Sequence, residues 1–269
     1  MFQTGRGLPK ICGGVELLLI FFHMNDDPTK NPLVMSRRQV LVFLGTTGAA
    51  VLAGRSNVYT ASDTSTAGKL PACVLTPKQT EGPYFVDEQL KRTDIRVDPA
   101  DGSVKTGAPL TLALRVSSIN NAGCTPVPDA IVDIWHCDAA GAYSDVTDPG
   151  FRTVGKKFLR GYQVTDTNGT VRFTTIYPGW YRGRTVHIHF KGRAKAKSGK
   201  TYELTSQLYF DDALTDRVHA QQAYASKGRQ RTRNNQDGLF RNGGRQLTLS
   251  VAETRQGHAA TFEVGLQTA

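Results

Sequence analysis

The chain of 269 residues is poor in several residues and patterns that mark common protein classes. It has four cysteines, and none of them belongs to a CxxC pair or to a Cys/His zinc spacing. It shows no internal repeat, no alternation of strand and helix patterns, and no apolar run long enough to span a bilayer. These absences argue against a zinc-finger domain, a solenoid, a parallel α/β fold and an integral membrane protein.

The positive charge is not arranged as in a nucleic-acid-binding protein. The formal net charge is +10, but the lysines and arginines are scattered or lie in the N-terminal part and a few late loops. No helix-turn-helix, finger or aromatic-basic repeat accompanies them. We therefore expect no nucleic-acid partner. Attraction of anionic aromatic acids or polyphenols is the milder interpretation of the same charge.

The N-terminal part is predicted to be a targeting segment. Ser36-Arg37-Arg38 precedes an apolar run that ends at Gly54, which resembles a twin-arginine export signal with Val40 where Phe is usual. Residues 1–34 are then a possible misassigned upstream extension, 35–68 the signal and a linker, and 69–269 the domain. We expect a secreted, periplasmic or cell-surface protein that meets the membrane only through this transient signal. A short membrane anchor is the alternative.

The cysteines after the signal leave the redox state open. Cys73, Cys124 and Cys137 permit one disulfide and one free thiol in three pairings, or three buried thiols.

Many short strand patterns separated by turn signals predict the fold. Residues 110–117 alternate apolar and polar side chains, and Asn168-Gly169 predicts a hairpin turn. The only strong helical pattern in the domain covers 211–225. Further strands are expected at 130–137, 161–165, 170–176, 187–190, 203–210, 247–251 and 260–264. The sequence predicts an all-β fold, an antiparallel β-sandwich with long loops and little helix.

The pair His187-Ile188-His189 is the first chemical signal. Residues two apart on a strand point to the same face, so both imidazoles can bind one metal ion, although HxH alone is weakly specific. Residues 177–184 before the pair contain two tyrosines and no carboxylate. Phenolate is a hard anionic ligand that suits iron(III) better than zinc. His136 is one residue out of phase if Trp135 and Cys137 share the inward face.

Three stretches resemble the intradiol ring-cleavage dioxygenases, the family of catechol 1,2- and protocatechuate 3,4-dioxygenases. They are TPKQTEGPYF at 76–85, DAIVDIWHCDAAGAYSDV at 129–146 and YPGWYRGRTVHIHF at 177–190, joined by SQLYF at 206–210. The resemblance implies an Fe(III) enzyme that uses O2 to open a catechol-type ring between its hydroxyls, giving a cis,cis-muconate-type dicarboxylic acid.

The resemblance also implies site residues. Tyr143 matches the tyrosinate that stays bound to the metal, Tyr181 the tyrosinate that substrate displaces, and His187 and His189 the imidazole ligands. Arg184 and Gln207 match residues that stabilise the ring-derived intermediate. Four further tyrosines are interpreted as packing residues: Tyr162, Tyr177, Tyr202 and Tyr209. Asp133 is either a buried acid near the site or an outward-facing strand residue.

One departure from the family pattern concerns the substrate. Only Arg182 to Val186 separate Tyr181 from His187, and Thr185 stands where the family has proline. The pocket wall should therefore differ, and the ring substituents and the oligomeric state stay open. Two other functions are also open: a non-catalytic, transthyretin-like binding module, and a metalloenzyme using both histidines with a distant carboxylate.

Overall fold

The computed structural model describes residues 74–120, 123–196, 198–228 and 232–268. The export signal and the domain boundary at 69 lie outside these ranges. The strands are β1 (Pro109–Asn120), β2 (Gly123–Pro126), β3 (Ile131–Trp135), β4 (Thr147–Asp148), β5 (Phe151–Arg152), β6 (Arg160–Val164), β7 (Thr170–Ile176), β8 (His187–Lys195), β9 (Thr201–Tyr209), β10 (Val251–Thr254) and β11 (Gly257–Gln267). The α-helices are α1 (Asp212–His219) and α2 (Gly238–Arg241), and the 3-10 helices are η1 (Gln222–Lys227), η2 (Asn234–Gln236) and η3 (Gly244–Leu247).

Two sheets form the body of the domain. In the first, β10, β11 and β1 lie side by side, and β1 also pairs with β2 and β7. The second has the order β6-β3-β8-β9 and is antiparallel throughout. This confirms the expected all-β sandwich. One pairing differs from a purely antiparallel arrangement, because β1 and β11 run parallel.

Strand periodicity explains how the sheets pack and where the outer face lies. Leu112 and Leu114 of β1 are fully buried, and so are Ile188 and Phe190 of β8; all four belong to the main core. Because alternate residues of a strand point to opposite faces, His187 and His189 lie on the other face of the four-stranded sheet. The same alternation that builds the core therefore places the histidine pair outside it.

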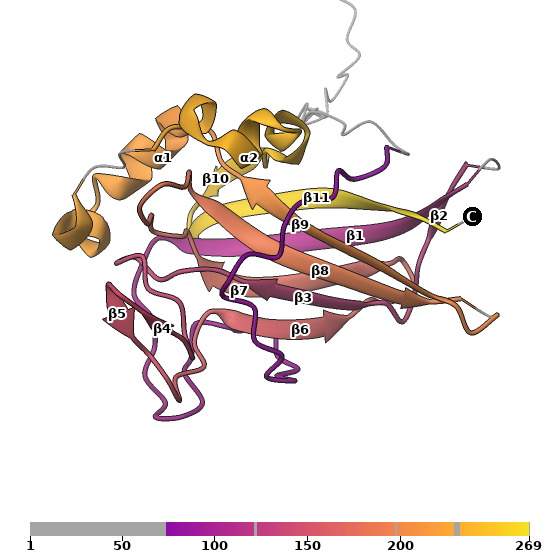
Figure 1. Ribbon diagram of the computed structural model, residues 1–269, viewed down its shortest axis with the longest axis horizontal. Helices are drawn as coiled ribbons and strands as arrows, with labels where there is room; N and C mark the ends of the chain where they lie inside the picture. The colour runs from indigo at the N-terminus through magenta and orange to yellow at the C-terminus, as the bar shows by residue number, and fades with distance from the viewer. Residues whose placement is uncertain (1–73, 121–122, 197, 229–231, 269) are drawn as a thin grey trace, which may run out of the picture. The chain divides into compact units, whose positions relative to one another are not determined.

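The segment before β1 crosses this outer face (Figure 1). Near one edge of the sheet the Gln79 amide donates to the Thr205 carbonyl of β9, and near the other the Tyr162 amide of β6 donates to the Leu90 carbonyl. The segment covers the histidine face and buries part of it against protein rather than water.

The helical segments all follow β9 and gather at one end of the sheets (Figure 1). The helix expected over 211–225 is shorter than predicted. Asp211 caps α1 by accepting from the Leu214 amide, and the helix ends before Gln221, whose extended backbone separates it from η1. The prediction also missed α2 and the 3-10 helices η2 and η3.

Two expected strand features were wrong. The turn at Asp166–Gly169 exists, with the Gly169 amide donating to the Asp166 carbonyl, but it joins β6 of one sheet to β7 of the other instead of closing a hairpin. Residues 247–251 do not form a strand, since Leu247 ends η3 and β10 begins at Val251. Leu247 and Leu249 are nevertheless buried in the core, and the Leu249 amide donates to the Tyr209 carbonyl in an isolated bridge beside β9.

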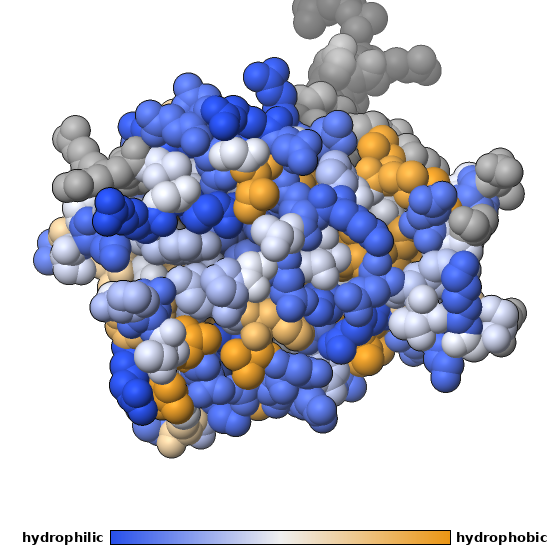
Figure 2. All heavy atoms as spheres, viewed as in Figure 1, coloured by the Kyte–Doolittle hydropathy of each residue, from blue (hydrophilic) through white to orange (hydrophobic). Residues whose placement is uncertain are grey.

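The face viewed in Figure 2 is mostly hydrophilic, with small and separate apolar patches. Among the described residues, the exposed large apolar side chains are Val74, Leu75, Val104 and Val154. Within the same ranges, no helix has the length and apolar character needed to cross a membrane.

Candidate metal centre

Strand register gathers the centre on the outer face of the four-stranded sheet. Trp135 of β3 and Gln207 of β9 are both register partners of His189 on β8. Tyr209 is the register partner of His187. Partners across neighbouring strands point to the same face, so these five side chains lie together although they come from distant parts of the sequence.

The two histidines present their Nε2 atoms to one point. The Nε2 atoms of His187 and His189 are 3.0 Å apart, and both rings are buried. Nδ1 of His187 lies 2.6 Å from the Thr185 carbonyl, which can only accept, so Nδ1 carries the proton and Nε2 offers a lone pair. Burial, aided by the Arg184 charge, lowers the pKa of His187 to about 3. The pKa of His189 also falls well below its usual value, first through burial.

Both predicted tyrosines lie beside the histidine pair, and the Tyr143 ring centroid is 6.2 Å from that of His189. The Tyr181 hydroxyl is 3.1 Å from His187 Nε2, and the Tyr143 ring centroid is 5.5 Å from that of Tyr181. The Tyr143 hydroxyl is buried and has no hydrogen-bond partner. Burial is the largest cause that raises the pKa of each phenol. A buried hydroxyl without a hydrogen-bond partner is unfavourable unless a bound ion or small molecule contacts it.

The loops that carry the tyrosines are held backbone to backbone. The Asp138 carboxylate accepts from the amides of Ala140 and Ala142, which shapes the turn before Tyr143. Gly179 packs so closely on this turn that an added Cβ would lie 2.4 Å from the Asp138 carbonyl oxygen. The Gly179 amide also donates to the Asp138 carbonyl, so the two loops pack directly against each other.

Aromatic rings enclose the centre. The Trp135 ring stacks on His189 with centroids 5.0 Å apart, and Tyr84 stacks on Tyr143 at 4.4 Å. The Tyr84 hydroxyl donates to Asp148, and burial is the largest cause that raises its pKa to about 12. Gly82 lies against His189, where an added Cβ would sit 3.2 Å from Cε1. Segment 80–85, in which the sequence pattern gave no residue a role, thus covers the site.

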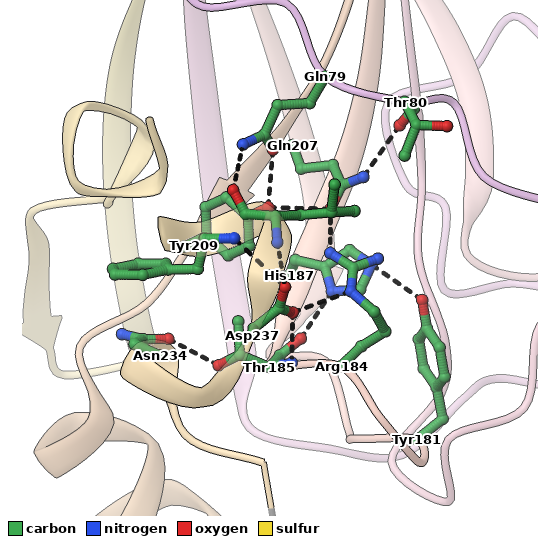
Figure 3. A network of polar contacts seen from close by, with 12 residues as sticks. Gln79, Thr80, Tyr181, Arg184, Thr185, His187, Gln207, Tyr209, Asn234 and Asp237 are labelled. Carbon is green, nitrogen blue, oxygen red and sulfur yellow. Dashed lines mark hydrogen bonds and ion pairs between the residues drawn. The ribbon is translucent and has the colours of Figure 1, made fainter. Parts of the chain in front are cut away.

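A polar network extends from the histidines (Figure 3). Arg184 donates through Nη2 to Gln207 Oε1 at 2.6 Å and through Nε to Asp237 at 2.8 Å. Gln207 donates to the Thr80 carbonyl, and the Tyr209 hydroxyl also donates to Gln207 Oε1. The structure thus brings Arg184 and Gln207 beside the histidine pair.

Other sequence predictions had mixed outcomes. His136 does face away from the centre, with Nε2 2.7 Å from the Thr175 hydroxyl. Tyr209 was interpreted as packing only, but its hydroxyl belongs to the polar network. Asp133 is buried in an ion pair with Arg193 and contacts none of the four predicted ligands.

The sequence reasoning missed Trp135, Tyr84 and Asp237 as neighbours of the site. Trp135 could have been found from strand periodicity, because it shares the phase of the histidine face. Asp237 lies 50 residues past His187 in an irregular segment, and no local pattern marks it.

Carboxylates and cysteines do not join the centre. Across the part of the chain that the structure describes, no group of three or more His, Cys, Asp or Glu side chains is placed to hold a metal ion. Cys137 is a buried free thiol, whereas Cys124 is disulfide-bonded. Of the three disulfide pairings that the sequence permits, this excludes the two that include Cys137.

The chain is similar to known dioxygenases. The family model described as Dioxygenase matches residues 80–232. An intradiol ring-cleavage dioxygenase from Tetranychus urticae is 30% identical, with a TM-score of 0.63 over 72% of this chain and 95% of that one. The dioxygenase domain of a carbohydrate-binding fusion protein from Streptomyces sp. SirexAA-E is 32% identical, with a TM-score of 0.53 over 73% and 100% of the two chains.

A curated relative, the protocatechuate 3,4-dioxygenase beta chain of Burkholderia cepacia, is 34% identical over 122 residues, which cover 42% of this chain and 51% of that one. The chain spans about half the length of this relative. The β-sandwich and the match over residues 80–232 place the protein among the dioxygenases. Within that class, the chain belongs to the intradiol ring-cleavage dioxygenase family.

Proposed function

We propose that the protein uses Fe(III) and O2 to cleave a catechol-type ring between its two hydroxyls, giving a cis,cis-muconate-type dicarboxylic acid. The observation that carries the proposal is the gathering of two neutral imidazole Nε2 atoms with the partly buried phenol of Tyr181 and the fully buried phenol of Tyr143, whose hydroxyl has no hydrogen-bond partner. Two neutral nitrogen donors and two anionic phenolates would cancel most of the charge of a hard trivalent cation.

The donor set fits iron(III) bound by Tyr143, Tyr181, His187 and His189. Without a cation, burial holds both phenols in the protonated form, since it raises each pKa. A bound cation reverses that preference, because its charge favours the phenolate. The alternative with two histidines and a carboxylate lacks support, since Asp237 is already engaged by Arg184 and the Thr185 amide.

When bound, iron(III) supplies a Lewis acid for the catecholate and the electronic coupling that allows it to react with O2. The chain's own residues prepare the substrate. Tyr181 is only partly buried, whereas Tyr143 is 1% exposed, which supports Tyr181 as the ligand that yields to substrate and takes up one of its phenolic protons. In this proposal, the Arg184 charge opposes negative charge on the substrate oxygen.

The enclosure by Trp135, Tyr84 and Tyr143 supports an aromatic substrate. Flat rings at the site offer stacking and edge contacts to another ring. Small-molecule catechols and O2 are accordingly the proposed reaction partners. Which catechol is preferred depends on the short stretch Arg182–Val186, where the chain departs from the family pattern.

The direct test combines colour, metal content and turnover. Purified protein should be burgundy, because phenolate-to-iron(III) charge transfer absorbs visible light, and should contain close to one iron per chain. Oxygen uptake with a panel of catechols should yield products with the absorbance of muconate-type acids. A colourless protein that holds zinc would contradict the proposal, and an iron-free protein that binds catechols without consuming O2 would favour the non-catalytic binding module.

A further inference from the structure

Asp237 is a buried carboxylate in the segment that follows the family match, which ends at residue 232. Its residue is 2% exposed. Oδ2 accepts from Arg184 Nε at 2.8 Å and from the Thr185 amide at 2.9 Å. Oδ1 accepts from the amides of Leu239 and Phe240 at 2.7 and 3.2 Å, so the same side chain caps α2.

The contacts of Asp237 and Gln207 fix Arg184 from two sides. Asp237 holds Nε, and Gln207 Oε1 holds Nη2 at 2.6 Å (Figure 3). Gln207 is itself fixed, because its Nε2 donates to the Thr80 carbonyl at 2.9 Å and its Oε1 also accepts from Tyr209. The guanidinium plane is therefore set by one group from the sheet and one from the late helical segment.

We propose that Asp237 is a positioning residue that orients Arg184 for its work beside the metal centre. The inference rests on the proposed function for the catalytic importance of Arg184, but assigns Asp237 a role that neither the sequence patterns nor the family match covers. An arginine side chain has several rotatable bonds, and a carboxylate acceptor at Nε removes most of that freedom.

The position of the Asp237 carboxylate also predicts whether its removal raises or lowers the reaction rate. Asp237 contacts Nε, on the stem side of the guanidinium, and the Thr185 amide, two residues before His187. An acceptor there leaves the far end of the guanidinium for other partners. If Asp237 acted mainly by cancelling the Arg184 charge, its removal would raise the reaction rate; positioning predicts a fall.

Asp237→Asn tests the inference with little change in shape. Asparagine is as good a helix cap as aspartate, so it can still accept from the α2 amides. In the variant, either the amide nitrogen faces Arg184 Nε and cannot accept its hydrogen bond, or the amide oxygen accepts it without a negative charge. In both cases the orientation of the guanidinium is lost. We expect kcat/KM, normalised to bound iron, to fall by about 10- to 100-fold, as for other outer partners of metal sites.

Two comparisons separate positioning from a structural role. Asp211→Asn changes a matched cap, since Asp211 caps α1 through the Leu214 amide and contacts none of the network; its kcat/KM should stay at the wild-type value. In an Arg184→Gln background, Asp237→Asn should lower kcat/KM less than about twofold further, because a residue that acts through Arg184 has nothing left to position. If Asp237→Asn does not fold, Asp237→Ser takes its place in the same comparison of wild-type and Arg184→Gln backgrounds, because serine keeps a hydroxyl that can cap α2.

The outcomes are distinct. An active wild type whose Asp237→Asn variant keeps or gains kcat/KM overturns this inference alone. Equal losses in the wild-type and Arg184→Gln backgrounds do the same, because they show an effect independent of Arg184. Thermal unfolding of the four proteins adds a readout without turnover: Asp237→Asn should lower Tm less in the Arg184→Gln background. A wild type that consumes no O2 with any catechol overturns the proposed function, and this inference with it.

Discussion

At the scale of single residues, the properties of the site follow from burial. Tyr143 is fully enclosed by Trp135, Cys137 and Tyr84, and its hydroxyl is left without a partner. In a protein without metal that arrangement would be a net penalty, because a buried hydroxyl gives up water and gains no hydrogen bond. The penalty disappears when the hydroxyl becomes a metal ligand.

Tyr143→Phe is therefore the sharpest substitution at the centre. It removes one oxygen and leaves the ring to fill the same space, so thermal stability without metal should stay equal or rise. kcat/KM should fall by more than the roughly 10- to 100-fold typical of losing an outer partner of a metal ligand, and the visible band should weaken and shift, because Tyr181 would be the one phenolate left of the proposed pair. Absorption spectra and oxygen uptake measure both.

Tyr202→Phe is the matched control, because Tyr202 lies far along β9 beside Lys200 and contacts none of the four proposed ligands. A Tyr143→Phe protein with unchanged colour and rate would show that Tyr143 is not a ligand, and would revive a centre built from histidines and carboxylates.

His136 predicts how stability depends on pH. Burial is the main cause that lowers its pKa from 6.5 to about 4, so the folded state resists a proton that the unfolded chain accepts. The stabilising contribution is fully present above pH 6.5 and is lost as pH falls toward 4. It amounts to about 3 kcal/mol by the usual conversion of a pKa difference.

Urea unfolding at pH 7 and pH 4.5 checks this expectation. The free energy of unfolding should be lower at pH 4.5, and His136→Gln should be less stable at pH 7 but lose less on acidification. An equal loss in both proteins would assign the acid sensitivity to other groups, such as the buried His219.

At the scale of elements, the centre depends on two loops that pack directly against each other. Gly179 and the turn after Asp138 are in direct backbone contact, and Gly141 on that turn adopts a positive φ of 83°. A side chain at either glycine would push apart the loops that carry Tyr143 and Tyr181.

Gly179→Ala should accordingly destabilise the fold by about 1–3 kcal/mol, the usual effect of overpacking, and weaken iron binding. Gly192→Ala on β8 is the control, since nothing lies within 4 Å of its added Cβ. Denaturant midpoints and iron titration measure the two effects. Equal behaviour of the two variants would mean that the loops can separate without harm to the site.

The elements also show how far sequence reasoning can reach. Period-two alternation was enough to predict β1, β7, β8 and β9 and to place His187 and His189 on one face, because that signal is local. Parallel pairing of β1 with β11 and the crossing of Asp166–Gly169 between sheets depend on contacts made over long stretches of sequence. A turn motif fixes only its own few residues, so it cannot say which sheet the next strand joins.

The same distinction applies to the site. The tyrosines, the histidines, Arg184 and Gln207 lie in stretches that resemble the family, and the structure brings them together. Asp237 was missed because it belongs to no pattern; folding alone carries the start of α2 back against the residues just before β8. The role of Tyr209 was underestimated because its ring is buried in the core while its hydroxyl takes part in the polar network.

At the scale of the whole molecule, the disulfide at Cys124 bears on where the protein works. Disulfides persist mainly in oxidising compartments, which supports the prediction of export. The proposed iron site adds a second argument, since a route that carries folded proteins would let the iron be bound before export. Both arguments agree with the Arg37-Arg38 pair, which lies outside the described residues.

Replacing Arg37 and Arg38 together by lysine should therefore stop export and leave an active, unprocessed enzyme in the cytoplasm of a bacterial host with a twin-arginine pathway. Arg55→Lys, a matched change just after the apolar run, should export normally. Fractionation, immunoblotting and oxygen uptake of each fraction measure the result. Export of the double variant at the wild-type level would contradict the twin-arginine route. An unprocessed wild type in the membrane fraction would instead favour the anchor over residues 40–54, with the metal centre held at the membrane surface.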